Sequence, residues 1–307
     1  MHTEHSVVVA ASASSLYRLV SNPVWWPSIF APCVHVRQLD RDAVTERFQL
    51  WAIVNDEVKT WTSRRRFDAG GLRIEFEQES SQAPIASMGG VWEFRQLAGD
   101  RCEVVLGHHF TAVDGDRTAL DWITQGVDAN SEGELAALAR LVESRCPLDE
   151  VIFSFEDRVQ VHGDVAGAYE FIARSDRWST RLAHVRRVDL IEAPGGIQWM
   201  EMDTVTADGA AHTTKSVRLC FPRKHIVYKQ LLPPELLIGH SGTWEFESAG
   251  GSVVVTARHR VAVDADAVPR LLGSAATLVD AGNYLREKLG ANSRATLAAA
   301  AASEGVV

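Results

Sequence analysis

The sequence of 307 residues is poor in cysteine, with four residues of this type and no Cys-x-x-Cys spacing among them. Scattered cysteines are typical of a reducing compartment, in which they remain free thiols. The chain also lacks any run of about 18 apolar residues, which excludes a membrane-spanning helix. The opening segment Met1–His5 has no positive stretch followed by an apolar one, so no secretory signal is indicated. The sequence therefore predicts a cytoplasmic protein without a membrane partner.

Several motifs of cofactor chemistry are missing as well. There is no His-Glu-x-x-His motif and the 11 histidines are dispersed, so no metal site is expected. No Gly-x-Gly-x-x-Gly follows a predicted strand, which argues against a dinucleotide. A Gly-x-Ser-x-Gly elbow is absent too, which argues against a serine nucleophile for acyl transfer. The formal net charge of −9 provides no broad basic surface, so we expect neither a cofactor nor a nucleic-acid partner.

The most informative feature that is present is a duplication at an offset of about 152 residues, in which Trp26 recurs as Trp178. Offsets that drift by a few residues and then recover indicate loop insertions within one repeated fold. Because the period exceeds that of solenoid repeats, each copy should be a whole domain. We expect domains at 1–147 and 151–307. Further repeated pairs are Gly90–Phe94 with Gly242–Phe246, Ser63 with Ser216, Arg65 with Arg218, His109 with His259, and Val127 with Val279.

Each half begins with a short strand and a capped helix. Ser12 precedes the helical segment 13–20 and Asp164 precedes 165–173, and both are good N-cap residues. Long alternating runs then predict antiparallel strands joined by hairpin turns. The strands expected in the first half are Ser6–Ala10, Val34–Leu39, Val44–Val54, Val58–Phe67, Leu72–Gln78, Ile85–Phe94 and Glu103–Val113, and the second half repeats them from Phe153–Val161 through Val185 to Val263, with turns at 194–196, 208–209 and 249–251.

A long helix closes each half, because apolar residues recur there at spacings of three and four. A curved antiparallel sheet must cover its apolar concave face, and one helix across it covers that face incompletely. The sequence therefore predicts an α+β protein of two tandem helix-grip domains, each with an interior cavity between sheet and helix. The helix-face residues are Leu120, Ile123, Val127, Leu138 and Leu141 in the first half, and Leu271, Ala275, Leu278, Gly282, Leu285 and Leu289 in the second.

The strongest candidate for chemistry is the strand that contains Trp61, Ser63 and Arg65. Alternation along a strand places these three side chains on one face. A guanidinium in an apolar cavity needs a partner or a ligand, and it can stabilise negative charge that develops on a carbonyl oxygen. Alternatively, Arg65 lies at the sheet rim or pairs with a nearby carboxylate. Candidates for that partner are Asp68, Glu75 and Glu77.

This motif, following the segment Trp26-Pro-Ser-Ile-Phe30 in a duplicated chain, resembles the two-domain aromatase/cyclases of bacterial type II polyketide synthases, within the START/Bet v 1-like superfamily. The resemblance covers essentially the whole chain. It implies a poly-β-ketone substrate tethered to an acyl carrier protein, first-ring aldol closure between carbons 7 and 12 of a reduced chain, and dehydration to an aromatic ring. It also implies that Trp26 lies at the cavity entrance and that Cys33 replaces a tyrosine of single-domain relatives.

The second copy keeps Ser216 and Arg218 but has Thr214 at the tryptophan position, so its cavity should have a different wall. We therefore predict Arg65, Ser63, Arg218 and Ser216 as catalytic candidates. The predicted substrate-binding residues are Trp61, Trp26, His35, Trp92, Trp178 and Trp244.

Each of the weaker site candidates has a structural alternative. The Gly-x-Trp-x-Phe strand of Trp92 is equally typical of core packing. His35 could shuttle protons near neutral pH or could simply begin a strand. His108 and His109 should point to opposite faces of one strand, and His259, on an apolar strand face, is typical of a satisfied core histidine. For the whole protein, the alternative to an enzyme is a carrier of lipids or other hydrophobic ligands that uses the same fold without catalysis, and one half could serve the other only structurally.

Overall fold

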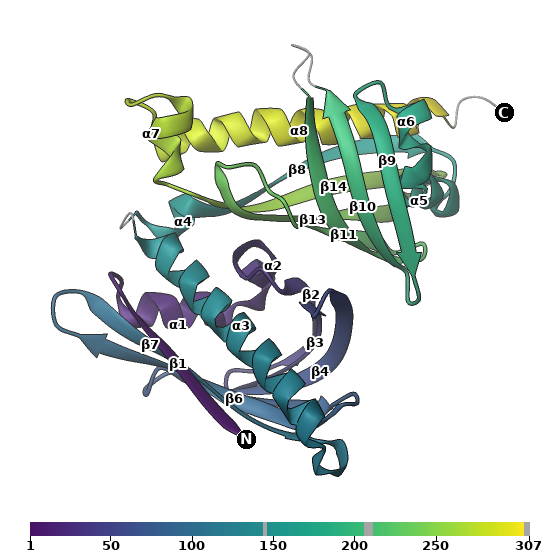
Figure 1. Cartoon of the computed structure of the whole chain (residues 1–307). Coiled ribbons are helices and arrows are strands. Elements are labelled where there is room, and N and C mark those ends of the chain that lie inside the picture. Colours follow the sequence, from purple (N-terminus) through teal and green to yellow (C-terminus); the bar gives the residue numbers. More distant parts are fainter. Residues whose placement is uncertain (144–145, 206–210, 304–307) are drawn as a thin grey trace. The chain divides into compact units, whose positions relative to one another are not determined.

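The computed structural model describes residues 1–143, 146–205 and 211–303. The chain divides into two compact units, Met1–Leu148 and Asp149–Val307. No helix in the described ranges is both long and apolar enough to cross a membrane. Each unit has one sheet and one long helix (Figure 1).

The elements of the first unit follow the predicted order. They are β1 (His2–Val9), α1 (Ala13–Ser21), a 3-10 turn (Pro23–Trp25), α2 (Trp26–Ile29), β2 (Cys33–Arg41), β3 (Thr45–Val54), β4 (Glu57–Asp68), β5 (Arg73–Ser80), β6 (Ile85–Leu97), β7 (Arg101–Ala112), a second 3-10 turn (Val113–Gly115) and α3 (Arg117–Val142).

The second unit repeats this order after the short helix α4 (Leu148–Val151). Its elements are β8 (Ile152–His162), α5 (Val165–Ala173), a 3-10 turn (Ser175–Arg177), α6 (Trp178–Arg181), β9 (Val185–Ala193), β10 (Ile197–Val205), β11 (Ala211–Phe221), β12 (His225–Gln230), β13 (Leu237–Ala249), β14 (Ser252–Val263), α7 (Ala267–Leu272) and α8 (Leu278–Ser303). The turn expected at 208–209 lies outside the described residues.

The two described sheets are antiparallel, have seven strands each and share one topology. Their strand orders are β1-β7-β6-β5-β4-β3-β2 and β8-β14-β13-β12-β11-β10-β9. Each strand of the second sheet thus takes the place of its counterpart in the first. The predicted duplication of an α+β helix-grip fold is confirmed.

The caps predicted for the first helix of each unit are present. The Ser12 hydroxyl accepts a hydrogen bond from the Ser15 amide at 3.3 Å, and the Asp164 carboxylate accepts one from the Gly167 amide at 2.8 Å. Each bond satisfies an amide that the first helical turn leaves without an intrahelical partner. These caps fix where α1 and α5 begin, directly after the first strand.

The repeated Gly-x-Trp pattern has a steric reason. A Cβ atom at Gly90 would collide with the Gly107 carbonyl and the Phe76 ring, and one at Gly242 would collide with the Arg258 carbonyl and the Tyr228 ring. Glycine at these positions therefore lets an aromatic ring of the neighbouring strand cross β6 or β13. Two residues further on, Trp92 and Trp244 lie opposite isoleucines and are almost fully buried.

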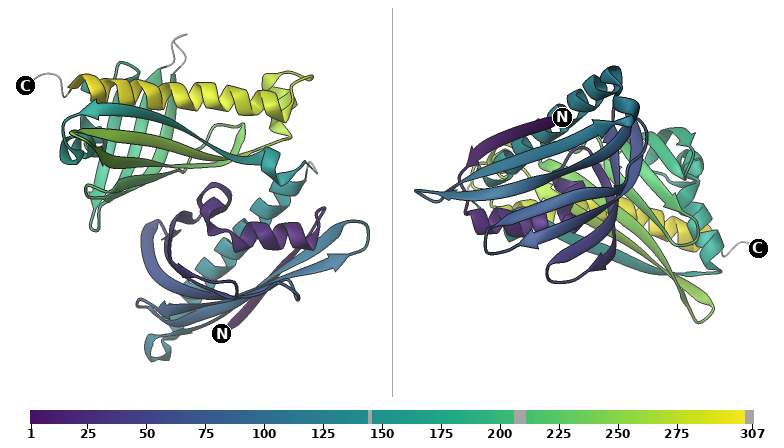
Figure 2. Two further views of the ribbon diagram at one scale, coloured as in Figure 1. Left: turned by 180° about the vertical axis from the view of Figure 1, so that it is seen from behind. Right: turned by 90° about the horizontal axis from the view of Figure 1, so that it is seen from below.

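The long helices lie across the concave sides of their sheets, α3 in the first unit and α8 in the second (Figure 2). In α3 the predicted face is buried at Ile123, Val127, Leu138 and Leu141. The helix face predicted for the second unit was wrong at Leu271 and Ala275. Gly273 adopts a φ of 107° and ends α7, so these two residues precede the long helix. The face of α8 therefore begins at Leu278 and includes the buried Ala281 and Leu285.

Candidate active site

A cavity of about 200 Å³ lies within the first unit. The predicted β4 face of Trp61, Ser63 and Arg65 contributes to its lining, together with Trp26 from α2 and Trp92 from β6. Side chains from α3 form another part of the wall. Most of this lining is apolar, so the few polar groups can orient a ligand. They are Lys59, Thr60, Ser63, Arg65, Gln78, Gln82, His108, Asn130, Ser131 and Glu134.

Arg65 is held in one position by partners on every side. Its Nε atom donates to Glu46 Oε2 at 3.0 Å, Nη1 donates to the Val20 carbonyl at 2.9 Å and Nη2 donates to the Ser21 carbonyl at 3.1 Å. The guanidinium carbon lies 4.8 Å from the Trp26 ring, a cation–π distance. Arg65 is 2% exposed, and this burial lowers the pKa of its guanidinium while the Glu46 carboxylate raises it.

The predicted partners of Arg65 were wrong. Glu46, which lies directly opposite Arg65 in the β3–β4 ladder, is the carboxylate that pairs with it. The three expected carboxylates bind elsewhere, because they lie near the solvent-exposed side of the sheet. Glu75 pairs with Arg73, Glu77 with His109, and Asp68 accepts a hydrogen bond from the Gly71 amide.

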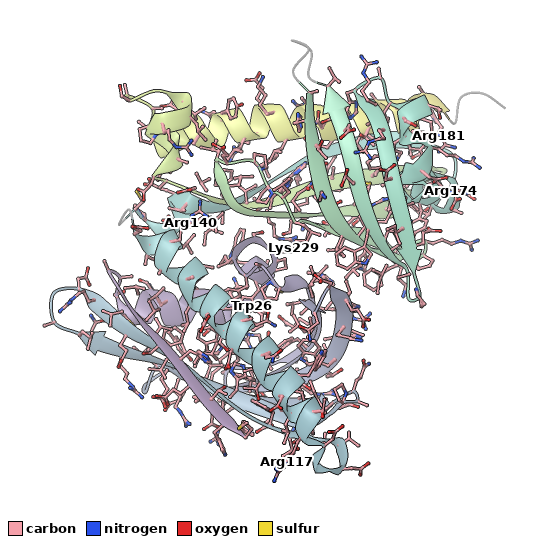
Figure 3. The ribbon with its side chains drawn as sticks, viewed as in Figure 1. Trp26, Arg117, Arg140, Arg174, Arg181 and Lys229 are labelled. Carbon is pink, nitrogen blue, oxygen red and sulfur yellow. The ribbon has the colours of Figure 1, made fainter. Side chains whose placement is uncertain are left out.

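Trp26 contacts Arg65 and also lines the cavity. Trp26, labelled in Figure 3, begins α2, and its indole Nε1 donates to the Val20 carbonyl at 3.1 Å. That carbonyl also accepts from Arg65, so the indole and the guanidinium share one backbone anchor. Trp26 therefore has a positioning contact with Arg65 in addition to its place in the cavity lining.

His35 is placed outside the cavity lining. The β2–β3 register shifts between Cys33 and His35, so the two side chains no longer share a strand face. Cys33 lines the cavity, whereas the His35 ring lies 5.2 Å from the Trp51 ring. Simple alternation along the strand therefore misplaces His35.

The helix side of the cavity has an acid–base group that sequence reasoning missed. Glu134, half-buried on α3, lines the cavity, and burial raises the pKa of its carboxyl to about 8. His108, on β7, lines the same cavity, and burial lowers its pKa to about 4. At neutral pH the carboxyl is therefore mostly protonated and the imidazole neutral. The single-sequence pattern gave no signal for Glu134, because a charged residue on a surface helix is ordinary.

Replacing Glu134 with glutamine should change the pH dependence of stability. A carboxyl whose folded-state pKa is raised above its unfolded value stabilises the fold fully below about pH 4.5, and this contribution is lost as pH rises through 8. We expect Glu134→Gln to match the wild type at pH 4 and to exceed it in free energy of unfolding at pH 9. The gain is on the order of 1.4 kcal/mol for each unit of pKa shift. Urea unfolding at the two pH values measures it, and equal stabilities at pH 9 would contradict the assigned pKa.

The second unit has a smaller cavity of about 130 Å³. Ser216 and Arg218 of β11 line it, with Trp178 and Trp244 as aromatic walls and Thr214 at the position of Trp61. The Arg218 guanidinium carbon lies 5.2 Å from the Trp178 ring, which repeats the contact between Arg65 and Trp26. The structure thus places the predicted residues of both halves at equivalent positions.

A histidine–serine pair also recurs in both units. His108 and His259 lie opposite Gly90 and Gly242, so His259 takes the place of His108. The predicted equivalence with His109 was therefore wrong by one residue. A ring nitrogen of His108 lies 3.4 Å from Ser131 Oγ on α3, and one of His259 lies 3.0 Å from the corresponding hydroxyl on α8, that of Ser293.

The second cavity adds a hydrogen-bonded cluster that sequence reasoning did not find. The Tyr228 hydroxyl lies 2.9 Å from Nδ1 of His259, and Nε2 of His240 lies 3.0 Å from the same atom. Burial lowers the pKa of His259 to about 4 and holds that of His240 well below its usual value. No group of three metal-ligating side chains suited to an ion occurs in the described ranges.

Comparisons with known proteins place this geometry in a family. The family described as "Polyketide cyclase / dehydrase and lipid transport" matches residues 9–120. The chain is 52% identical to the actinorhodin polyketide synthase bifunctional cyclase/dehydratase of Streptomyces coelicolor, over 98% of this chain and 96% of that protein. It is 47% identical to the granaticin counterpart of Streptomyces violaceoruber, over 97% of this chain and 93% of that one.

Solved structures of two-domain proteins are similar over the same span. The di-domain ARO/CYC BexL superposes with a TM-score of 0.84 at 40% identity, over 98% of this chain and 97% of that one. The di-domain ARO/CYC StfQ from the steffimycin pathway superposes with a TM-score of 0.79 at 36% identity, over the same shares. Both helix-grip units are therefore included in the similarity.

Proposed function

Since this chain belongs to the family of polyketide synthase bifunctional cyclase/dehydratases, we propose that it acts on a reduced poly-β-ketone chain bound to an acyl carrier protein. It closes the first ring by aldol condensation between carbons 7 and 12, and it then removes water to give an aromatic ring. The names of the similar proteins support the reaction class, and the cavity with the Ser63 and Arg65 face carries the proposal. The substrate stays on its carrier protein, so we place the reaction in the cytoplasm.

Orientation is the main contribution of the first cavity. A poly-β-ketone is intrinsically reactive, because methylenes between two carbonyls are acidic, and an unguided chain closes in several ways. A shaped cavity that brings two chosen carbons together removes most of the entropic barrier to the correct closure. The aromatic side chains of Trp61 and Trp92 provide flat walls for the growing ring.

Arg65 and Ser63 supply the electrostatic contribution. Glu46 compensates the net charge of Arg65, so the guanidinium acts as a fixed hydrogen-bond donor: Nη1 carries two hydrogens, of which the Val20 carbonyl accepts one. A preorganised donor in a dry site stabilises the alkoxide or enolate oxygen that forms during closure, without reorganisation at the moment of reaction. Ser63, two residues away on the same strand face, donates a hydrogen bond to that oxygen. Glu46 and the Val20 and Ser21 carbonyls hold the guanidinium in place for this role.

Glu134 of α3 and His108 of β7 supply proton transfer for dehydration. Glu134, protonated at neutral pH, donates a proton to the departing hydroxyl, and the neutral His108 accepts one from the ring. The pKa values of the two groups are shifted in opposite directions from their usual values, as an acid and base pair requires. We assign this chemistry to residues 1–147, since the second unit, 151–307, has Thr214 in place of the aromatic wall.

Reconstitution with a minimal polyketide synthase and a ketoreductase tests the proposal. The synthase supplies the carrier-bound chain, and the products are identified by mass spectrometry and NMR. Without the protein we expect a mixture of spontaneously closed products, and with it one product whose first ring lies between carbons 7 and 12. The alternative of a hydrophobic-ligand carrier predicts an unchanged product mixture, and that result would refute the enzymatic proposal.

A further inference from the structure

The two arginine sites differ in the residue that faces the guanidinium across the sheet. In the first unit Arg65 lies opposite Glu46, and in the second Arg218 lies opposite Gln198. Gln198 Oε1 accepts a hydrogen bond from Arg218 Nη1 at 2.8 Å. A neutral amide thus occupies the position of a carboxylate, and the ion pair of the first site has no counterpart in the second.

The other partners of Arg218 are neutral as well. Nη1 donates to Ser175 Oγ and Nη2 to the Ile172 carbonyl, both at 2.6 Å. Gln198 Nε2 in turn donates to Glu192 Oε1 at 3.0 Å, and Glu192 is exposed. Within the described residues no ion pair joins Arg218 to an acidic side chain. The positive charge of Arg218 is therefore not neutralised by a contacting carboxylate.

This charge is buried among neutral groups, away from water. Arg218 is 1% exposed, and desolvation lowers the pKa of its guanidinium, although arginine stays protonated in proteins. Burying a cation without a counter-charge is costly, so such a site favours an anionic ligand. The lining of the second cavity, unlike that of the first with Glu134, contains no aspartate or glutamate among the described residues.

Two neighbouring polar atoms lack partners in the described structure: a hydroxyl that can donate to an anionic oxygen, and an amide oxygen that can accept from a ligand hydroxyl. Ser216 Oγ and Gln230 Oε1 are both buried without a hydrogen-bond partner in the described structure. The two residues lie opposite each other in the β11–β12 ladder, and both line the cavity. Ser216 is 2% exposed and lies two residues before Arg218 on one strand face. Its hydroxyl can donate to an oxygen that also faces the guanidinium.

The rest of the cavity suits a flat oxygen-bearing ring. Trp178 and Trp244 supply aromatic surface, and the positions of Phe76 and Met88 in the first unit hold Tyr228 and His240 in the second. The second cavity is therefore richer in hydrogen-bond donors than the first.

We propose that the second cavity binds a flat aromatic monoanion whose charged oxygen, that of a carboxylate or of an enolate or phenolate, contacts Ser216 and lies against the uncompensated charge of Arg218. The anion supplies the charge that Glu46 supplies to Arg65 in the first unit. This gives the second unit a ligand chemistry of its own, and it does not depend on the reaction proposed for the first unit.

Calorimetric titration with small aromatic probes tests this inference on the full-length protein. The probes are 2-naphthoate, its neutral isostere 2-naphthamide, and 4-nitro-1-naphtholate at pH 8. We expect 2-naphthoate to bind about tenfold or more tightly than 2-naphthamide. Equal affinities for this pair would overturn the inference. Binding of both anions supports an enolate or phenolate as the natural ligand, whereas binding of the naphthoate alone supports a carboxylate.

A charge relocation tests the role of Arg218 at constant net charge. In the double variant Gln198→Glu/Glu192→Gln the carboxylate moves inward onto Arg218, and Glu192→Gln alone is the matched control. We expect the double variant to lose the preference for 2-naphthoate, by about tenfold or more, while the control keeps it. Unchanged naphthoate affinity in the folded double variant would overturn the inference.

Ser216→Ala provides an independent variant, since the hydroxyl has no partner in the described structure and its removal should not destabilise the fold. We expect naphthoate affinity to fall several-fold and naphthamide affinity to stay the same. An equal loss for both probes would indicate a packing effect and would contradict the proposed contact.

Discussion

Arg65→Ala is expected to lower the yield of the correctly closed product about a hundredfold. Loss of a preorganised hydrogen-bond donor from a dry site commonly removes on the order of 3 kcal/mol of transition-state stabilisation. The carrier-bound chain would still form and would close without guidance, so products of spontaneous closure should rise as the correct product falls. Chromatographic product profiles with the minimal synthase measure both quantities in one assay.

The control for this variant has to account for Glu46. Removing Arg65 alone breaks its buried ion pair and leaves the Glu46 carboxylate with Arg41, 3.2 Å away, as its remaining ionic partner, which is destabilising. Arg65→Met/Glu46→Gln removes the pair together and should fold better while remaining equally inactive. Arg65→Lys keeps the charge but loses the planar set of donors, so it should be partly active. A folded double variant with wild-type product yield would show that Arg65 has no catalytic role.

Gly126→Trp should strongly reduce correct closure without unfolding the protein. Gly126 lies on α3 in the cavity lining, and a Cβ atom there would have only Val54 Cγ1 nearby, at 3.9 Å. An indole at this position would extend into a cavity of about 200 Å³ and take the space of the substrate. Since orientation by the cavity carries most of the proposed catalysis, we expect at least about a tenfold loss of correct product.

Gly126→Ala is the matched control for the tryptophan variant. Alanine fits the same space, and it should stabilise the helix by about 0.5–1 kcal/mol because glycine has more backbone freedom to lose on folding. We expect its product profile to match that of the wild type, and its thermal midpoint to rise. Wild-type yield from the folded tryptophan variant would place the reaction outside the first cavity.

The fold was predictable because the pattern that specifies it is local and appears twice. Ser12 and Asp164 cap their helices as expected, and alternating runs gave the strands to within a few residues. The break at Gly273 was missed, because the apolar spacing continues from Leu271 across it. The segment 273–277 separates the two helices: Gly273 has a φ of 107°, and the Thr277 hydroxyl accepts a hydrogen bond from the Asp280 amide at 3.2 Å at the start of α8.

The cavity face of β4 was predictable from local alternation along the strand. The partner of Arg65 could be predicted only from the register between β3 and β4. Asn55 and Asp56 both have positive φ and form the turn between β3 and β4. Once the turn is centred on this pair, Glu46 falls opposite Arg65. A bulge between Cys33 and His35 has no such marker in the sequence. Glu134 was hidden because its environment is created by tertiary burial.

The most direct test of the central claim, that the first unit closes the ring, compares Arg65→Ala with Arg218→Ala. Both arginines are buried, line a cavity and pack on a tryptophan, although Arg65→Ala also breaks the ion pair with Glu46, so only folded protein is compared. The measurement is the yield of product with the first ring between carbons 7 and 12, from folded proteins at equal concentration. The account predicts about a hundredfold loss for Arg65→Ala and a clearly smaller loss for Arg218→Ala. A greater loss for Arg218→Ala would contradict it and would assign ring closure to the second unit.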